Sequence, residues 1–316
     1  MNQFKFYAVL FLLILTSCKE SRKNEQPVKS TLQHNTKNIV FVLPEIPAML
    51  TTNEQRTHFL ATHYWNNYPF ADTTLLNSSF DFEQIWANYI NLLLCVDTKT
   101  AAESLKKTLK KASESKQVFT QFIEMSEKYL YDPNSPTRRE ELYIPVLETM
   151  IKSKVLTDTE KIRPQNLLKL AMKNRIGQRA LNFTFTKQSG QTQTLYSVQA
   201  GYTLLLFYEP DCNSCTQAIS ELQQLETINA YTQNGTLKVL AIYADEEEME
   251  AWKKQLPSMP DKWTVGYDKG MIIKSNNLYD LKASPTMYLL DENKKVLLKD
   301  VTTVWIEKFL QEKSKK

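Results

Sequence analysis

The sequence predicts an all-α domain followed by an α/β domain. Its 316 residues include only six glycines, and none of these lies among the first 176 residues. A stretch without glycine has few residues that readily adopt the positive φ of tight turns, which favours a helical first half. In the second half, apolar runs at residues 202–208 and 237–243 alternate with helical patterns. This alternation is typical of a sheet whose central strands are covered on both faces.

The composition along the chain predicts four segments. We expect a signal peptide over residues 1–17, a flexible tether over 18–38, a helical domain over 39–174 and the α/β domain over 175–316. The tether is polar and shows no hydrophobic periodicity, as expected of a linker. The first glycine, Gly177, lies close to the predicted boundary between the two folded domains.

Charge and residue distribution exclude several classes of function. The net charge of +4 is close to neutral for this length, whereas nucleic-acid binding requires a clustered basic surface. The glycine spacing contains neither a dinucleotide-binding fingerprint nor a phosphate-binding loop. All three histidines lie within the first 63 residues, which excludes His-dependent triads and His-rich metal sites from the second half. We therefore predict no cofactor, no metal site and no nucleic-acid partner.

The N-terminus has the features of an export signal. Lys5 precedes an apolar stretch over residues 6–15, which is too short to span a bilayer as a helix. The stretch ends in Leu-Thr-Ser before Cys18, and a small residue before a cysteine at this place resembles a bacterial lipobox. The resemblance implies cleavage before Cys18, lipidation of its sulfur, and a lipid-anchored, periplasm-facing protein of the bacterial envelope. The alternatives are an ordinary signal peptide with an incidental cysteine, or a short anchor.

Helical periodicity dominates the first folded half, after a short extended run at residues 39–43. The predicted helices cover residues 52–68, 82–96, 101–112, 118–130, 136–151 and 164–173. Thr52 is expected to cap the first of them, and Ser135 is expected to cap the fifth, with Pro136 at its first position. The apolar and aromatic stripes have the spacing of a helical core, so this half is interpreted as an interaction or spacer domain.

Cys95 lies in the second predicted helix. In an apolar helix, a cysteine is most often a small buried side chain, so we expect Cys95 to be buried. The alternative is a reactive or resolving thiol.

The second half alternates strands and helices. Short runs at residues 182–186 and 192–196 predict a hairpin closed by Ser189 and Gly190. Further strands are expected at residues 202–208, 237–243, 263–267, 287–290 and 296–299. Helices are expected from the C-x-x-C motif to residue 231, at 246–256 and at the C-terminal end.

The C-x-x-C motif, Cys212-Asn213-Ser214-Cys215, lies between a predicted strand and a predicted helix. Unpaired N–H groups and the macrodipole at a helix N-terminus stabilise a thiolate at the first cysteine. Cys212 is therefore the expected nucleophile, and Cys215, one turn inside the helix, is expected to resolve the mixed disulfide. A static structural disulfide is the main alternative. A metal site lacks a second cysteine pair or a nearby histidine.

At this point the sequence resembles the thioredoxin superfamily, most closely its TlpA/ResA-like envelope branch. The matching features are residues 177–183, the strand–Cys212-x-x-Cys215–helix unit, the strand at 238–243 and residues 283–291. The resemblance covers residues from about 175 to 316, and implies a central mixed sheet flanked by helices.

The resemblance also implies roles and partners. Ser284 and Pro285 would orient a bound substrate strand, and a cis peptide bond at Pro285 would place backbone beside the two sulfurs. The implied partners are protein thiols or disulfides and an envelope electron donor or acceptor. Residues 129–139 resemble an uncharacterised helical domain that precedes thioredoxin-like domains in some Gram-negative lipoproteins.

Three departures from the family pattern affect the chemistry. Asp211 stands where tryptophan is usual, and its negative charge opposes thiolate formation at the next residue. Asn213-Ser214 replaces Gly-Pro between the cysteines. Leu206 stands where thioredoxins carry a buried acid, a role for which Glu209 and Asp211 are the nearest substitutes.

The expected function is that of a membrane-anchored thiol–disulfide oxidoreductase of the bacterial envelope, which reduces or exchanges disulfides through the Cys212–Cys215 dithiol. Peroxidase chemistry is disfavoured, because the Pro-Thr-Cys loop of the peroxiredoxins is missing around Cys212. The alternative function is a non-catalytic thioredoxin-like binding module of a lipoprotein complex, with a structural disulfide.

Overall fold

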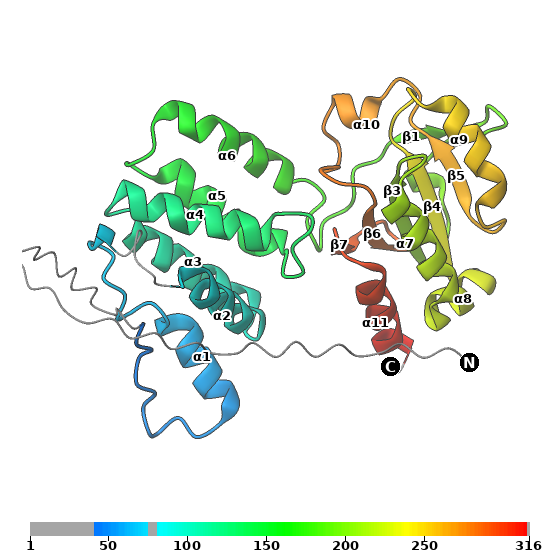
Figure 1. Ribbon diagram of the computed structural model, residues 1–316. Coiled ribbons are helices and arrows are strands. Elements are labelled where there is room, and N and C mark those ends of the chain that lie inside the picture. The colour runs from blue at the N-terminus through cyan, green and yellow to red at the C-terminus, as the bar shows by residue number, and fades with distance from the viewer. Residues whose placement is uncertain (1–40, 75–80, 315–316) are drawn as a thin grey trace, which may run out of the picture. The chain divides into compact units, whose positions relative to one another are not determined.

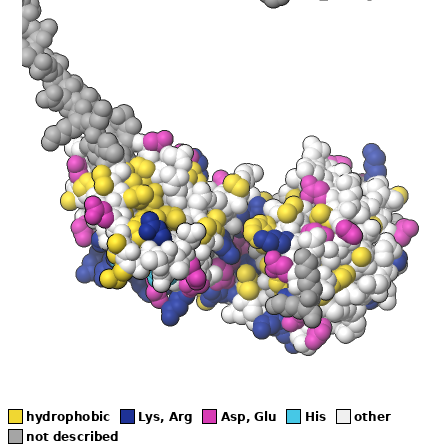
Figure 2. Space-filling view, turned by 90° about the horizontal axis from the view of Figure 1, so that it is seen from below, with side chains coloured by type: hydrophobic (Ala, Val, Ile, Leu, Met, Phe, Trp, Pro, Cys, Tyr) yellow, Lys and Arg dark blue, Asp and Glu magenta, His cyan; other side chains and the backbone are white. Residues whose placement is uncertain are grey.

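The computed structural model describes residues 41–74 and 81–314 (Figure 1). The predicted signal peptide, Cys18 and the predicted tether lie outside the described residues. Within the described ranges, no helix combines the length and the apolar composition that crossing a membrane requires. On the face shown in Figure 2, Lys and Arg side chains lie among Asp and Glu side chains.

The first half of the described chain is all-α, as predicted (Figure 1). Its helices are α1 Asn53–His63, α2 Phe82–Leu94, α3 Thr98–Ala112, α4 Lys116–Leu130, α5 Glu140–Lys152 and α6 Asp158–Ala171. Thr52 caps α1 as expected, through a capping box with Gln55.

An aromatic cluster forms the core of this helical region. Phe122 of α4 is fully buried, and its ring centroid lies 4.9 to 5.5 Å from those of five other aromatic rings. These rings belong to Trp65, Tyr68, Phe70, Phe82 and Trp86. The apolar stripes therefore form a core, as their helical spacing predicts.

Three helix boundaries differ from the predictions by four residues or more. The first helix ends at His63 rather than at residue 68, because the chain turns there with Asn66 N–H donating to the His63 carbonyl. The prediction of Ser135 as a helix cap was wrong: its hydroxyl donates to the Tyr129 carbonyl at 2.7 Å and closes the turn before α5, which begins at Glu140. The sixth helix begins at Asp158 rather than at residue 164, because Thr157 forms a capping box.

Another expectation for this half was wrong. Cys95 is exposed rather than buried, because it is the cap that ends α2 and follows the buried stripe of that helix.

The second half contains one seven-stranded mixed sheet in the order β2-β1-β5-β4-β3-β6-β7. The strands are β1 Thr184–Thr186, β2 Thr192–Thr194, β3 Tyr202–Tyr208, β4 Leu237–Tyr243, β5 Thr264–Tyr267, β6 Thr286–Asp291 and β7 Val296–Lys299. Strand β3 lies inside the sheet, where it runs parallel to the middle strand β4 and antiparallel to β6. The predicted hairpin is confirmed as β1 and β2, whose turn includes Gly190 at φ 83°.

Apolar side chains cover both faces of the sheet. On one face, alternate residues of β3 (Leu204, Leu206 and Tyr208) pack in a cluster with residues of α7 and α11. On the other face, Leu205 and Phe207 belong to a second cluster.

The helices of this half are α7 Asn213–Gln224, α8 Glu226–Gln233, α9 Met249–Gln255, α10 Ile272–Ser275 and α11 Thr303–Ser314, with 3₁₀ turns η2 Leu195–Ser197 and η3 Leu256–Ser258. The predicted fold class is therefore confirmed in both halves.

The helix after the C-x-x-C motif is broken in two, whereas the sequence predicts one helix to residue 231. The break lies at Leu225, between α7 and α8. The Glu307 carboxylate of α11 accepts hydrogen bonds from the backbone N–H groups of Thr227 and Ile228, at 2.9 and 3.0 Å. It satisfies the N-terminus of α8 from a distant part of the chain, which helical periodicity does not reveal.

Candidate active site

Cys212 and Cys215 lie at the start of α7, in the segment that follows strand β3. Cys212 is the N-cap residue of α7, and Cys215 lies in its first turn. The two residues form a disulfide, with their Cα atoms 5.2 Å apart. The backbone N–H of Cys215 donates to the sulfur of Cys212 at 3.2 Å. The helix start therefore supplies Cys212 with the positive electrostatic environment that its predicted role requires.

The two sulfurs differ in accessibility. Cys212 is partly exposed, whereas Cys215 is 0% exposed and belongs to the apolar cluster under α7. An intermolecular attack requires an accessible sulfur, and only Cys212 offers one. The Cys215 sulfur is bonded to the Cys212 sulfur inside this cluster.

The loop before β6 brings Ser284 and Pro285 to the cysteines. The Ser284–Pro285 peptide bond is cis. The Ser284 carbonyl oxygen lies 3.8 Å from the Cys212 sulfur, across 72 residues of sequence. The pairing of β6 with β3 produces this proximity, because β3 leads into Cys212 and β6 follows Pro285. Four of the five predicted site residues therefore lie together, and the fifth, Cys18, lies outside the described residues.

Ser214 is a site residue that the sequence did not single out. Its hydroxyl lies 3.2 Å from the Cys212 sulfur and donates to the Ser284 carbonyl at 3.0 Å. It therefore links the C-x-x-C motif to the cis-proline loop. Its position between the two cysteines could have identified it from the sequence, because the usual motif has at this position a proline, which carries no hydroxyl group.

Charged groups lie around the entrance to the site. Asp211 is exposed and has φ 55°, a left-handed conformation that Asp tolerates better than bulky residues. Solvent weakens the effect of its charge on the Cys212 sulfur. Glu209 lies 3.8 Å from the Lys274 ammonium, which is also paired with Asp245 at 2.5 Å. Burial alone lowers the pKa of Lys274, but the hydrogen bond to Asp245 and the negative charges of Asp245 and Glu209 together outweigh burial and raise the pKa above its usual value.

Apolar side chains surround Cys215 on the β3 side. Leu206 is fully buried and belongs to the same cluster as Cys215, so the position of the usual acid is filled by a leucine side chain. The nearby Tyr208 hydroxyl accepts a hydrogen bond from Trp252 Nε1 at 2.9 Å, and burial raises its pKa well above the usual value. Among the described residues, no group of three or more His, Cys, Asp or Glu side chains is arranged to hold a metal ion.

Two family models match the sequence. One is described as "Domain of unknown function (DUF5106)" and matches residues 17–174. The other is the AhpC/TSA family and matches residues 176–299. None of the curated proteins matches this chain.

One solved structure is similar over most of the chain. The crystal structure of a thioredoxin-like protein from Bacteroides caccae ATCC 43185 has 47% sequence identity and a TM-score of 0.84. The match covers 87% of this chain and 99% of that chain. This chain belongs to the same thioredoxin-like family. Helices α1–α6 of this chain all lie within the region that matches DUF5106, as the resemblance to an uncharacterised helical domain implied.

Two other solved structures match less than half of this chain. The C-terminal domain of an uncharacterized protein from Bacteroides fragilis NCTC 9343 is 50% identical, with 44% of this chain and 98% of that chain covered and a TM-score of 0.43. The thioredoxin domain of a thiol-disulfide oxidoreductase from Bacteroides vulgatus is 21% identical, with 44% of this chain and 96% of that chain covered and a TM-score of 0.39.

Proposed function

We propose that this protein is a thiol–disulfide oxidoreductase that acts on protein disulfides through Cys212 and Cys215. The observation that carries the proposal is the unequal exposure of two disulfide-bonded cysteines at a helix start, beside a cis-proline loop. An accessible sulfur at an N-cap and a buried partner three residues later are the two groups that disulfide exchange requires.

The reaction proceeds in two exchanges. In the reduced protein, the Cys212 thiolate attacks one sulfur of a substrate disulfide, and the other substrate sulfur leaves as a thiolate. The Cys215 thiolate then attacks the Cys212 sulfur, breaks the mixed disulfide and releases the second substrate thiolate. Two electrons pass to the substrate, and the Cys212–Cys215 disulfide forms. A dithiol donor reverses the change in the protein, and the same steps in reverse oxidise a substrate.

Ser284 and Pro285 are proposed to orient the substrate strand. The Ser284 carbonyl lies beside the Cys212 sulfur, where a polypeptide that carries the attacked disulfide must approach. Leu206 fills the position of the usual buried acid, so Glu209 and Asp211, which precede Cys212 in the chain, are proposed to exchange protons with the thiols.

The competing function is a binding module with a permanent disulfide, which the leucine at position 206 favours. Insulin reduction in the presence of dithiothreitol separates the two functions. We expect the wild-type protein to accelerate the precipitation of reduced insulin, and a Cys212→Ser/Cys215→Ser variant to show the rate of dithiothreitol alone. Equal rates for the wild type and the double variant would reject the enzymatic function. Differential alkylation in cells then reports direction, because a reductase is mostly dithiol and an oxidant is mostly disulfide.

We further propose that lipid on Cys18 anchors the protein to a membrane of the bacterial envelope. Its support is the apolar stretch followed by Leu-Thr-Ser-Cys. Cys18→Ala is expected to move the protein from the membrane pellet to the soluble fraction or to block its processing, because the acyl chains supply the membrane affinity. Cys95→Ala, at the exposed cysteine that caps the C-terminal end of α2, is the matched control and is expected to stay in the pellet. A Cys18→Ala protein of normal mature size that stays in the membrane pellet contradicts the lipobox assignment.

A further inference from the structure

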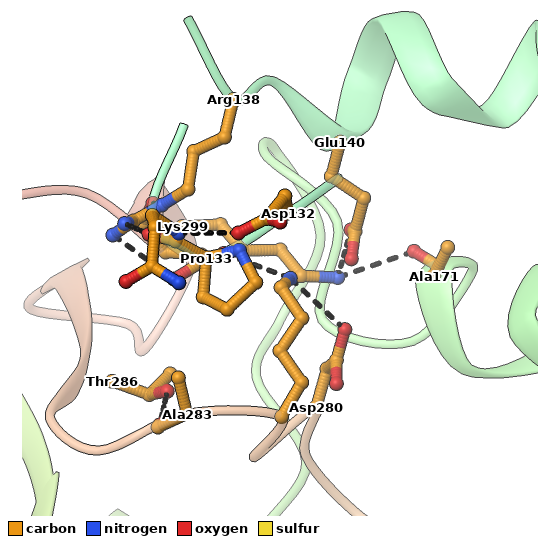
Figure 3. A network of polar contacts seen from close by, with 12 residues as sticks. Asp132, Pro133, Arg138, Glu140, Ala171, Asp280, Ala283, Thr286 and Lys299 are labelled. Atoms are coloured by element: carbon orange, nitrogen blue, oxygen red, sulfur yellow. Dashed lines mark hydrogen bonds and ion pairs between the residues drawn. The ribbon is translucent and has the colours of Figure 1, made fainter. Parts of the chain in front are cut away.

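A polar network connects the helical region to the loop that carries Ser284 and Pro285 (Figure 3). Arg138, in the turn before α5, donates through Nε to the Asp300 carbonyl at 3.3 Å, and its Nη2 lies 3.4 Å from the Asp300 carboxylate. The Asp300 carboxylate is also paired with the Lys282 ammonium at 2.9 Å. Arg138 therefore acts on Lys282 through one shared carboxylate.

Lys282 holds its own loop in a defined arrangement. Its ammonium lies 3.3 Å from the Asp280 carboxylate and 4.6 Å from the centroid of the Tyr131 ring, which belongs to the helical region. Two residues after Lys282, the Ser284 carbonyl faces the Cys212 sulfur. The segment between Asp280 and Ser284 thus has ionic contacts at one end and contacts with the C-x-x-C motif at the other.

The network is largely removed from solvent. The side chains of Lys282, Asp280 and Asp300 are 13%, 6% and 14% exposed. Ion pairs at such exposures are weakly screened, and loss of one partner leaves the others poorly compensated. Arg138 is itself held in place, because its Nη1 donates to the Pro133 carbonyl at 2.5 Å. The guanidinium therefore presents a fixed donor set to Asp300.

A second contact between the same regions does not involve this loop. Arg175 is paired with Glu141 of α5, and its Nε donates to that carboxylate at 3.1 Å. The side chains are 31% and 19% exposed, close to the 21% of Arg138. Among the described residues, the Arg175 guanidinium has Glu141 and Met172 as its partners rather than residues 280–285, so Arg175 provides a matched arginine for comparison.

We propose that Arg138 of the helical region is a positioning residue that holds the Asp280–Pro285 loop against Cys212 through Asp300 and Lys282. This inference rests on the proposed function for its consequence in catalysis. It assigns a task to the helical region: the region fixes the backbone that receives the substrate strand, without touching the substrate. The crystal structure from Bacteroides caccae, similar over 87% of this chain, spans both regions.

Trypsin cleavage can measure how firmly the loop is held, because trypsin cleaves after lysine and Lys282 lies within the loop. In the folded protein, the ion pairs and burial of Lys282 protect the bond to Ala283. Arg138→Ala is expected to accelerate cleavage after Lys282 roughly three- to tenfold, and to raise the KM for insulin by a similar factor with a smaller change in kcat. Arg175→Ala is expected to change neither. Cleavage after Lys238, in the central strand β4, reports global unfolding.

The outcomes separate this inference from the proposed function. Equal cleavage after Lys282 and equal KM values in Arg138→Ala and Arg175→Ala overturn the positioning role. If the wild type fails to reduce insulin, the proposed function fails, and cleavage after Lys282 alone decides whether Arg138 holds the loop. Should Arg138→Ala be cleaved after Lys238, Asp300→Asn is used in its place. Asparagine has nearly the same size as aspartate and tolerates the left-handed backbone of residue 300, at φ 50°. The same two outcomes, cleavage after Lys282 and the KM for insulin, decide the result for this variant.

Discussion

Cys215→Ser is expected to accumulate mixed disulfides through Cys212, whereas Cys212→Ser is expected to accumulate none. In Cys215→Ser, the accessible Cys212 sulfur still attacks a substrate disulfide, but no buried thiol remains to release the adduct. In Cys212→Ser, the remaining thiol of Cys215 is 0% exposed and does not reach a protein substrate. Both variants are expected to lose insulin reduction completely. Non-reducing gels of envelope extracts, with and without dithiothreitol, measure the adducts.

The control for this experiment is the remaining exposed thiol. Cys95 is the free cysteine of the described residues, so each variant is made in a Cys95→Ala background. Cys95→Ala alone is expected to retain wild-type activity. Adducts of equal amount in the two variants, or none in either, contradict the assignment of Cys212 as nucleophile.

Phe122→Ala is expected to lower the free energy of unfolding of the helical region by about 3 to 5 kcal/mol. Phe122 is fully buried, and its ring contacts five other aromatic rings, so truncation leaves a cavity that rigid neighbours fill poorly. Urea denaturation followed by far-ultraviolet circular dichroism measures the change, because helices dominate that signal.

Trp305→Ala is the matched control for aromatic truncation. Trp305 lies on α11 and is 56% exposed, with Lys308 over its ring. We expect a loss of less than about 1 kcal/mol, because little buried surface is lost. A similar midpoint for Phe122→Ala and the wild type would show that the aromatic cluster does not determine the stability of the helical region.

Strand positions in the second half were predictable from residue patterns. The strands β3, β4 and β7 begin and end at the predicted residues, because each is a short apolar run bounded by turn residues. The predicted aromatic and apolar stripes of the helical half likewise form its core. In both cases the pattern that predicts the structure is local, since a short window of sequence contains the alternate or helically spaced apolar residues that become buried.

Boundaries set by distant residues were not predictable in this way. Helical periodicity continues across Leu225, yet the chain breaks there because Glu307 of α11 satisfies the N-terminus of α8. Ser135 has the composition of a helix cap, but its hydroxyl closes a turn with Tyr129 instead. Both outcomes depend on competition between hydrogen-bond partners, which only the folded chain resolves.

The sequence by itself determined the fold class and the identity of the dithiol, because a C-x-x-C at the junction of a strand and a helix is a local pattern. Only the tertiary structure decided what surrounds the dithiol. Pairing of β3 with β6 brings Ser284 to Cys212, and packing leaves Cys212 accessible while it buries Cys215. The physical reason is that accessibility and proximity depend on contacts between residues far apart in the chain, whereas strand and helix periodicity depends on neighbours.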